Sequence, residues 1–514
     1  MVLKFSLLVV FFAIMIGVGL YCRKSATNVN GFVLGGRSVG PWLTAFAYGT
    51  SYFSAVIFVG YAGQFGWKFG IASTWIGIGN AVIGSLLAWG VLGRRTRLMS
   101  QHLESATMPE FFCKRYDSIA LKIFAAIIVF IFLIPYTASL YNGLSRLFSM
   151  AFPGIDYSVC VIIMAILTGI YVIAGGYMAT AVNDFIQGII MIGGIIAVIA
   201  AVLSQNGGFM EALNGLAYVE AEGFAPGVFN SFFGPDPLGL AFVVILTSLG
   251  TWGLPQMVQK FYAIKSEKDI TKGTIISTAF AIIVAGGCYF LGGFGRLFTD
   301  KLTFLPDGSI EGGFDAIVPT MLSNLPDILI AVVIVLVLSA SMSTLSSLVL
   351  ASSSTLTLDM IKGHVIKNMD EKKQVLTLRI LIVVFIVISA IIALNKDKLS
   401  AIAQMMGISW GALAGAFLAP FMYGLYYKKA TKASIWVSFI FGAGIMVLNM
   451  LCKGIFPELL QSPINCGVIA MIGGLILVPV VSWITPKPDQ EKVDGIFECY
   501  NRKVTVDAKK SLGE

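Results

Sequence analysis

The residues of this 514-residue chain that are most suited to chemistry are hydroxyl side chains within a long apolar stretch. Residues 338–347, LSASMSTLSS, carry six hydroxyls within nine positions. Ala340, Ser343 and Thr344 are spaced i, i+3, i+4, so they share one face of a helix. That face offers two hydroxyl oxygens and a carbonyl, which suit a small alkali cation better than a transition metal. Close helix packing through small residues is the alternative interpretation.

A second polar group lies in residues 47–55, AYGTSYFSA, where Thr50, Ser51 and Ser54 follow Gly49. A helix that breaks here would free backbone carbonyls, which bind hard cations such as Na⁺. Alternatively, the hydroxyls bond back to their own helix and the glycines allow close packing. The helix is expected to break or end near three glycines: Gly60, Gly63 and Gly66.

Trp252 and Pro255 interrupt another apolar segment, in the sequence GTWGLP. Freed backbone groups at such a break must line a cavity or pair with protein. Polar side chains lie beside it: Thr247, Thr251 and Gln256. Two interrupted helices in corresponding halves of a chain indicate an inverted-repeat transporter with its site near the membrane midplane.

Two further polar residues have a functional and a structural interpretation. Asp184 is either a stopping point for a cation on an inward path or a cap that the helix dipole favours. Gln404 is either a buried amide that contacts a solute or an interfacial residue near the start of a helix. Position alone favours the structural interpretation of both.

Composition identifies the class of protein to which these residues belong. The chain is 57% hydrophobic and only 12% charged, about half the usual charged fraction. It is therefore a polytopic membrane protein, and a secreted domain, a nucleic-acid binder or a cytosolic enzyme is excluded. No Gly-Lys dipeptide occurs, so there is no phosphate-binding Walker A loop. The seven cysteines show no metal-binding spacing, although a Cys452–Cys466 disulfide is possible.

Apolar stretches of about twenty residues predict thirteen transmembrane helices. They cover residues 5–22, 41–63, 71–93, 119–149, 156–175, 183–205, 237–259, 273–297, 325–358, 378–395, 401–427, 432–452 and 465–485. With the N-terminus outside, the predicted inside loops and tail hold 26 of the 35 basic residues and the outside positions hold eight. The positive-inside rule therefore favours an N-out, C-in topology.

Taken together, four sequence pieces resemble the sodium–solute symporters, the family that includes proline, pantothenate, sialic acid and sugar carriers. The pieces are GGRSVGPW at residues 35–42, GGYMA at 175–179 with NDFIQG at 183–188, GLPQ at 253–256 and SMSTLS at 341–346. The resemblance implies a leucine-transporter-type fold of five plus five helices in inverted repeats, and Na⁺-coupled uptake by alternating access.

This resemblance implies a division of the chain into six parts. Residues 1–40 would form a peripheral helix and loop, 41–205 the first repeat, 206–236 an external loop, 237–427 the second repeat, 428–485 two peripheral spans and 486–514 a cytoplasmic tail.

The resemblance also implies site residues. The cation would bind the carbonyls of Thr50, Phe53 and Ala340 and the hydroxyls of Ser343 and Thr344, and Asp184 would lie on its release path. By the same matching the solute would contact Val56, Gly60, Thr247, Thr251 and Trp252. Ser54 and Gln404 add a hydroxyl and an amide to the expected solute contacts.

The chain departs from the proline carriers at several of these positions. They have an acidic residue where this chain has Tyr52, and aromatic residues in place of Val56, Thr247 and Thr251. These departures argue against a proline substrate, and the pieces at 51–55 and 183–185 look closer to the pantothenate-type branch.

The sequence thus predicts a multi-pass plasma-membrane protein, not an enzyme, that imports a small polar organic solute with Na⁺. Its partners are the solute, Na⁺ and the lipid bilayer, with no nucleic acid or protein partner implied. A solute sensor on the same fold and a proton-coupled carrier are the alternatives.

Overall fold

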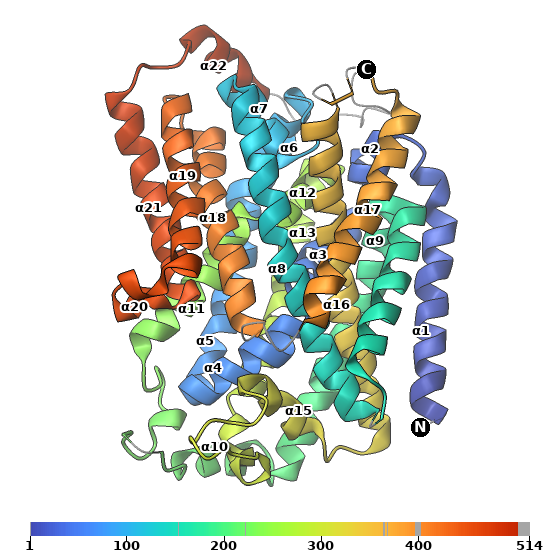
Figure 1. The fold of residues 1–514 in the computed structure, drawn as a ribbon, viewed down its shortest axis with the longest axis vertical. Coiled ribbons are helices and arrows are strands. Elements are labelled where there is room, and N and C mark those ends of the chain that lie inside the picture. The colour runs from blue at the N-terminus through green and yellow to red at the C-terminus, as the bar shows by residue number, and fades with distance from the viewer. Residues whose placement is uncertain are drawn as a thin grey trace.

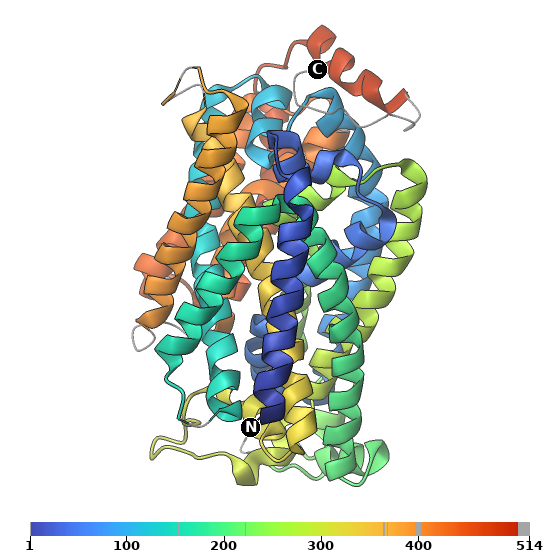
Figure 2. The same cartoon turned by 90° about the vertical axis from the view of Figure 1, so that its right-hand side faces the viewer.

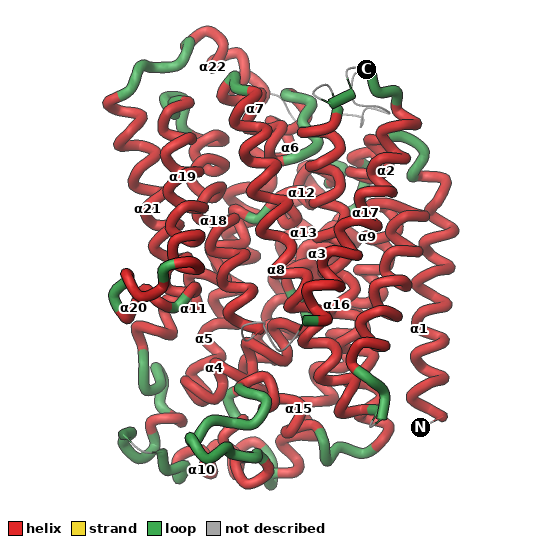
Figure 3. The backbone as a smooth tube through the Cα atoms, in the orientation of Figure 1, coloured by secondary structure: helices red, strands yellow, loops and turns green. Residues whose placement is uncertain are grey.

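The computed structural model describes residues 2–152, 154–221, 223–362, 365–366, 368–395 and 402–501. Within these residues the chain is helical, and its β-structure is limited to isolated bridges. Loops gather at the two ends of the elongated molecule, with helices running between them (Figure 3). This arrangement satisfies backbone hydrogen bonds within each helix, as a bilayer requires.

The helices have the following bounds in chain order. The first half contains α1 Val2–Tyr21, α2 Val29–Leu34, α3 Pro41–Tyr52, α4 Ala62–Phe69, α5 Thr74–Ala81, α6 Arg94–His102, α7 Met108–Tyr116, α8 Ile119–Ala151, α9 Tyr157–Gln205 and α10 Phe209–Ala217. The second half contains α11 Pro237–Leu249, α12 Pro255–Ala263, α13 Glu267–Ala281, α14 Gly287–Gly292, α15 Ile317–Leu322, α16 Asp327–Thr355, α17 Glu371–Leu394, α18 Ile402–Tyr426, α19 Lys432–Leu451, α20 Glu458–Gln461, α21 Pro463–Ile484 and α22 Gln490–Phe497. Short π-helical segments extend α5, α13 and α16.

Each of the thirteen predicted spans coincides with helical structure, but the helices are not thirteen separate units. In the described residues, ten helices are long and apolar enough to cross a membrane, and one bent pair adds an eleventh. Two of the ten, at 47 and 49 residues, are much longer than one crossing needs, and each is broken at a glycine with non-helical backbone angles, Gly70 and Gly176. Each covers parts of two predicted spans. The number thirteen and the N-out orientation remain predictions.

The 49-residue helix α9 changes direction at Gly176, whose φ of 55° and ψ of −145° suit glycine. A Cβ at this position would also lie 2.8 Å from the carbonyl oxygen of Phe32. The kink falls between the predicted spans 156–175 and 183–205. It divides α9 into two helices, one for each of these two predicted spans.

Two other helices are interrupted, as the sequence predicts. α3 ends at Tyr52, and Phe53 is extended before the π-helical segment Val56–Tyr61 begins. The break therefore lies before the glycines expected to cause it. In the other interruption, Leu254 is extended between Gly253 and Pro255, and α11 and α12 meet at 49°.

The periphery of the bundle is formed by the first and the last membrane helices. In Figure 1, α1 lies at one edge beside α9, whereas α19 and α21 lie at the opposite edge beside α18. α1 begins at the end of the molecule that carries α10, and α22 lies at the other end (Figure 1). Figure 2 shows α1 running along the outside of the bundle for most of its length.

The structure tests two further predictions, one about a disulfide and one about the C-terminal tail. Cys452 is exposed, Cys466 is buried, and both are free thiols, so the possible disulfide is absent. The first part of the predicted tail is ordered: α22 places Asp494 2.7 Å from Lys428. Tyr500 donates a hydrogen bond to the Leu425 carbonyl. Residues 502–514 lie outside the described residues.

Gly66 lies in α4 at a close contact between two helices. A Cβ at Gly66 would lie 2.0 Å from the carbonyl oxygen of Gly292, so α4 and α14 touch through backbone atoms. We expect Gly66→Ala to lower the thermal unfolding midpoint of the purified protein, because overpacking costs about 1–3 kcal/mol. Gly90→Ala is the matched control, since no atom lies within 4 Å of its added Cβ. Equal midpoints for the two variants would contradict this packing.

Candidate cation and solute site

The five predicted cation ligands lie together where α16 passes the break after α3. The Ser343 hydroxyl donates to the Thr50 carbonyl at 3.2 Å and to the Ala340 carbonyl at 3.0 Å. The Thr344 hydroxyl lies 3.1 Å from the carbonyl oxygens of Thr50 and Ala340 and 3.3 Å from that of Phe53. All five residues are buried. The structure thus gathers three carbonyl and two hydroxyl oxygens from the two segments that the sequence singled out.

The local fold explains why these oxygens are available. The last four carbonyls of a helix have no partner within it, and Thr50 belongs to the last turn of α3. Phe53 is extended, so its carbonyl also lies outside any regular helix. In a coordination shell with metal–oxygen distances of about 2.4 Å, two ligand oxygens that subtend roughly 90° at the metal ion lie ~3.4 Å from each other. The observed oxygen separations are close to this spacing.

The donor set is that of a hard cation. Within the described residues, no group of three or more His, Cys, Asp or Glu side chains is placed to hold a metal ion. The five oxygens gathered here are all neutral, and such a set would fit an alkali cation rather than a transition metal.

Asp184 is not the helix cap that its sequence position favours. It lies inside α9, beyond the kink at Gly176, with a fully buried side chain. Its Oδ2 atom is 3.8 Å from the Nζ atom of Lys260, and both side chains are buried. The structural alternative for Asp184 was therefore wrong, because the helix continues through this residue and a buried lysine faces it.

Lys260 directly follows the predicted span 237–259, so the sequence predicts that it lies in an inside loop. This prediction is wrong, because Lys260 lies in α12 with an almost fully buried side chain. Its ammonium donates to the Ser347 hydroxyl at 3.0 Å. One feature of the sequence indicates that Lys260 is buried: it lies in the helical segment that follows the break at Pro255. A lysine within one such helical segment can face the protein interior rather than solvent.

One part of the predicted solute site surrounds the π-helical segment after the α3 break. Val56 and Gly60 are buried there, and a Cβ on Gly60 would lie 2.8 Å from the Ile402 side chain at the start of α18. Gln404 is the third residue of α18 and is half-buried, which agrees with its position near a helix start. The Ser54 hydroxyl accepts a hydrogen bond from the Val56 amide.

The other part lies at the α11–α12 break. The Thr247 and Thr251 hydroxyls donate to carbonyls of their own helical segment, at 2.9 and 2.8 Å. The Trp252 indole donates to the Ile83 carbonyl at 3.0 Å, toward the third predicted span. Among the described residues, no hydrogen bond joins this part to the first one. Contact of either part with a solute stays a prediction.

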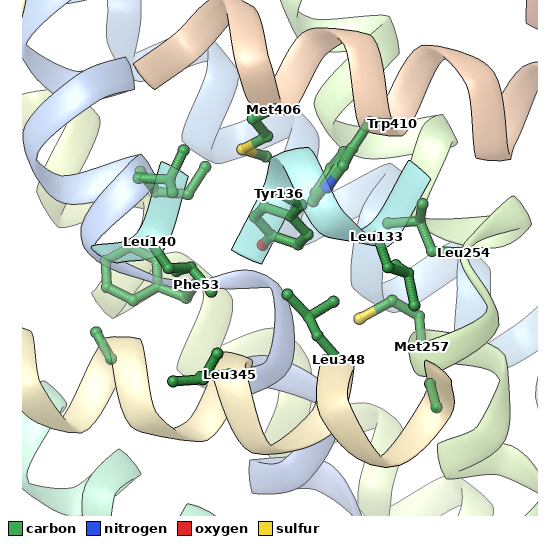
Figure 4. Close-up of a cluster of buried hydrophobic side chains, with 14 of the residues drawn as sticks. Phe53, Leu133, Tyr136, Leu140, Leu254, Met257, Leu345, Leu348, Met406 and Trp410 are labelled. Carbon is green, nitrogen blue, oxygen red and sulfur yellow. The ribbon is translucent and has the colours of Figure 1, made fainter. Parts of the chain in front are cut away.

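A buried aromatic cluster adjoins the α3 break and was not singled out in the sequence. Figure 4 shows Tyr136 of α8 beside Trp410 and Met406 of α18, with Phe53 and Leu345 nearby. The Tyr136 and Trp410 rings are 5.9 Å apart in an edge-on arrangement. Within the part of the chain that the structure describes, the Tyr136 hydroxyl, the Trp410 indole nitrogen and both amide atoms of Gln256 are buried and form no hydrogen bond. Such unpaired buried groups are available to a polar ligand.

The GGRS piece before α3 has a structural role. The Arg37 guanidinium donates to the carbonyls of Ser100, Ser105 and Tyr262 and to the Ser100 hydroxyl. Burial lowers the pKa of Arg37 to about 10. This side chain ties the segment that leads into the broken helix to α6 and α12.

In this structure, an interrupted helix places its carbonyl oxygens opposite a helix that carries hydroxyl groups. Ion-coupled secondary transporters use this arrangement at their binding sites. The structure matches that of a Na⁺-coupled sialic acid symporter with a TM-score of 0.71, covering 95% of this chain and 99% of the other at 19% identity. That similarity establishes the leucine-transporter-type fold.

The family model "Sodium:solute symporter family" matches residues 32–442, and the chain belongs to this family. It is 28% identical to the osmoregulated proline transporter OpuE of Bacillus subtilis, over 95% of this chain and 96% of that protein. It is also 28% identical to a sodium/proline symporter of Staphylococcus aureus, over 86% and 85% of the two chains. The protein is thus a transporter rather than an enzyme, and a multi-pass plasma-membrane protein.

Proposed function

We propose that this protein imports a small polar organic solute together with Na⁺ by alternating access. The observation that carries the proposal is the group of five buried oxygens contributed by Thr50, Phe53, Ala340, Ser343 and Thr344. A Na⁺ ion bound there would join the break after α3 to α16. Because a ligand shifts an equilibrium toward the conformation it binds best, Na⁺ would favour the state in which these two elements are close.

We propose L-proline as the first candidate solute. Both relatives described above are proline transporters, and neither is a pantothenate carrier. This similarity over most of the chain outweighs the short pieces that look closer to the pantothenate-type branch. The departures at Tyr52, Val56, Thr247 and Thr251 imply that any proline site here uses different side chains.

The proposed solute contacts are those predicted from the sequence, together with unpaired groups nearby. The sequence-derived set is Ser54, Val56, Gly60, Thr247, Thr251, Trp252 and Gln404. The Tyr136 hydroxyl and the Trp410 indole lie beside the α3 break and form no hydrogen bond with any described residue. A solute with one charged end and an apolar body would suit this mixture of polar atoms and aromatic rings.

The proposal is tested by thermal shift of the purified protein with a solute panel, in NaCl and in choline chloride. The panel contains proline, other amino acids, pantothenate, sialic acid and monosaccharides. We expect proline to raise the unfolding midpoint in NaCl but not in choline chloride. A ligand that binds only the folded protein stabilises it, and here proline binding requires Na⁺. Equal stabilisation in both salts would reject Na⁺ coupling, and stabilisation by another solute alone would reject proline.

A further inference from the structure

A groove of about 680 Å³ runs along the side of the bundle between α1 and α17. The first half of α9 lies between these two helices and packs against both (Figure 2). Every described residue that lines the groove is aliphatic or glycine, apart from Arg23 and Arg379. Large side chains such as Ile166, Val387 and Ile391 are about half exposed there. In a membrane this wall contacts the acyl chains of lipids, because the core of a bilayer is hydrocarbon.

The two arginines lie toward one end of the groove. Arg23 comes just after the end of α1, and Arg379 is in the third turn of α17, as the second residue of the predicted span 378–395. α17 begins at the end of the molecule that carries α22, and α1 runs toward that end (Figure 1). The positive-inside rule predicts that this end lies inside. The groove thus places positive charge where a lipid of the inner leaflet would have its headgroup.

The protein supplies no negative charge to these arginines. Within the part of the chain that the structure describes, Arg23 and Arg379 form no ion pair. The Nε atom of Arg379 is buried and has no hydrogen-bond partner among the described residues. Its guanidinium lies 5.8 Å from the centre of the Phe32 ring, a contact that brings no negative charge. Lys24, next to Arg23, adds a further positive charge. Because a buried donor that stays unpaired is costly, this end of the groove favours an anion.

The length of the groove suits an acyl chain. Its wall follows α17 from Arg379 to Leu394, a rise of about 22 Å at ~1.5 Å per residue. One leaflet contributes about half of the ~30 Å hydrocarbon thickness. A chain that starts from a headgroup at the arginines therefore stays within the groove across its own leaflet.

We propose that this groove binds an anionic phospholipid, with one acyl chain along α9 and α17 and the phosphate at Arg23 and Arg379. Arginine suits this role because its planar guanidinium donates two hydrogen bonds to phosphate oxygens at once. Basic pockets between transmembrane helices on the cytoplasmic side bind anionic headgroups in this way. The proposal involves neither Na⁺ nor a solute, so its test is independent of the proposed function.

The test is a native mass spectrometry titration of the purified protein in detergent, which counts bound lipids directly. Palmitoyl-oleoyl phosphatidylglycerol is compared with palmitoyl-oleoyl phosphatidylcholine, which has the same acyl chains but no net charge. Arg23→Gln/Arg379→Gln removes both positive charges. Arg23→Gln alone serves if the double variant does not fold, because Arg23 is exposed. Lys24→Gln is the matched control, since this exposed lysine does not line the groove.

A second pair of variants tests the apolar wall. A Cβ at Gly169 would lie 3.5 Å from the Ile386 side chain, which also lines the groove, so Gly169→Leu fills part of it. Gly193→Leu is the control on the other half of α9, because nothing lies within 4 Å of its added Cβ. We expect Gly169→Leu to weaken the binding of both lipids several-fold, since less acyl-chain surface is buried. Gly193→Leu should leave their binding unchanged.

We expect phosphatidylglycerol to bind the unmodified protein and Lys24→Gln roughly tenfold more tightly than phosphatidylcholine. Two basic residues beside an anionic headgroup support a preference of this size. Arg23→Gln should reduce the preference, and Arg23→Gln/Arg379→Gln should abolish it. Equal binding of the two lipids by the unmodified protein would overturn the proposal, as would an unchanged preference in the variants that lack arginine.

Two other occupants are distinguished in the same spectra. Displacement of phosphatidylglycerol by glycerol phosphate, which has no acyl chain, would reject the lipid in favour of a soluble phosphate. A dimer of the unmodified protein that Gly169→Leu converts to a monomer would reject the lipid in favour of a second copy of this chain. We expect neither result.

Discussion

Replacing both Ser343 and Thr344 with alanine should weaken Na⁺ binding about 100-fold or more. Each change removes one of five oxygens around the proposed ion and leaves the carbonyls of Thr50 and Phe53 without a hydroxyl partner. A hydrogen bond to a charged group contributes about 1.5–3 kcal/mol, and we take a hydroxyl–cation contact to be similar. Two such losses total at least about 3 kcal/mol, and each 1.4 kcal/mol is a tenfold change in affinity. The measurement is a ²²Na⁺ titration of the purified variant.

The matched control for this variant is Ser353→Ala on the same helix. The Ser353 hydroxyl donates to the Leu350 carbonyl one turn earlier, away from the α3 break. Its removal should leave Na⁺ affinity unchanged, as should Thr344→Ser, which keeps the oxygen. Unchanged Na⁺ binding in the double variant would show that the ion, if bound, lies elsewhere.

The second large effect is expected on stability. Asp184→Asn leaves the Lys260 ammonium buried without its counter-charge, while the asparagine occupies the same space. Removing one partner of a buried ion pair typically costs about 3–5 kcal/mol, because the remaining charge stays out of water. We therefore expect a clearly lower thermal unfolding midpoint for Asp184→Asn in detergent without Na⁺.

Removing both charges together separates this effect from general disruption. Asp184→Asn/Lys260→Met has no uncompensated charge, so its midpoint should recover most of the loss. A double variant as unstable as the sum of its single changes would contradict the idea that the two charges compensate each other.

Those parts of the site that depend only on neighbouring residues in the chain could be predicted from the sequence. The 3.6-residue period alone places Ala340, Ser343 and Thr344 on one face. Proline at position 255 has no amide hydrogen and clashes with a preceding helical turn, so the break before α12 is visible in the sequence. The apolar stretches likewise located helical structure throughout the described chain.

Other features depend on contacts between segments far apart in the chain. The surroundings of Lys260 include Asp184 and Ser347, which come from two other helices. Apart from its place after the Pro255 break, the local sequence does not distinguish this buried lysine from those of a cytoplasmic loop. The α3 break falls at Phe53 rather than at Gly60, because α16 supplies hydroxyl partners for the freed carbonyls there. Gly60 and Gly66 instead permit close contact with other segments.

The central claim is that solute movement and Na⁺ movement are coupled through the oxygens of α3 and α16. The most direct measurement is ²²Na⁺ entry into proteoliposomes that contain the protein, with and without an inward gradient of unlabelled proline. We predict that proline accelerates ²²Na⁺ entry for the unmodified protein, and that Ser343→Ala/Thr344→Ala abolishes the acceleration. Labelled proline that enters at the same rate in NaCl and choline chloride, with no change in ²²Na⁺ entry, would contradict the account.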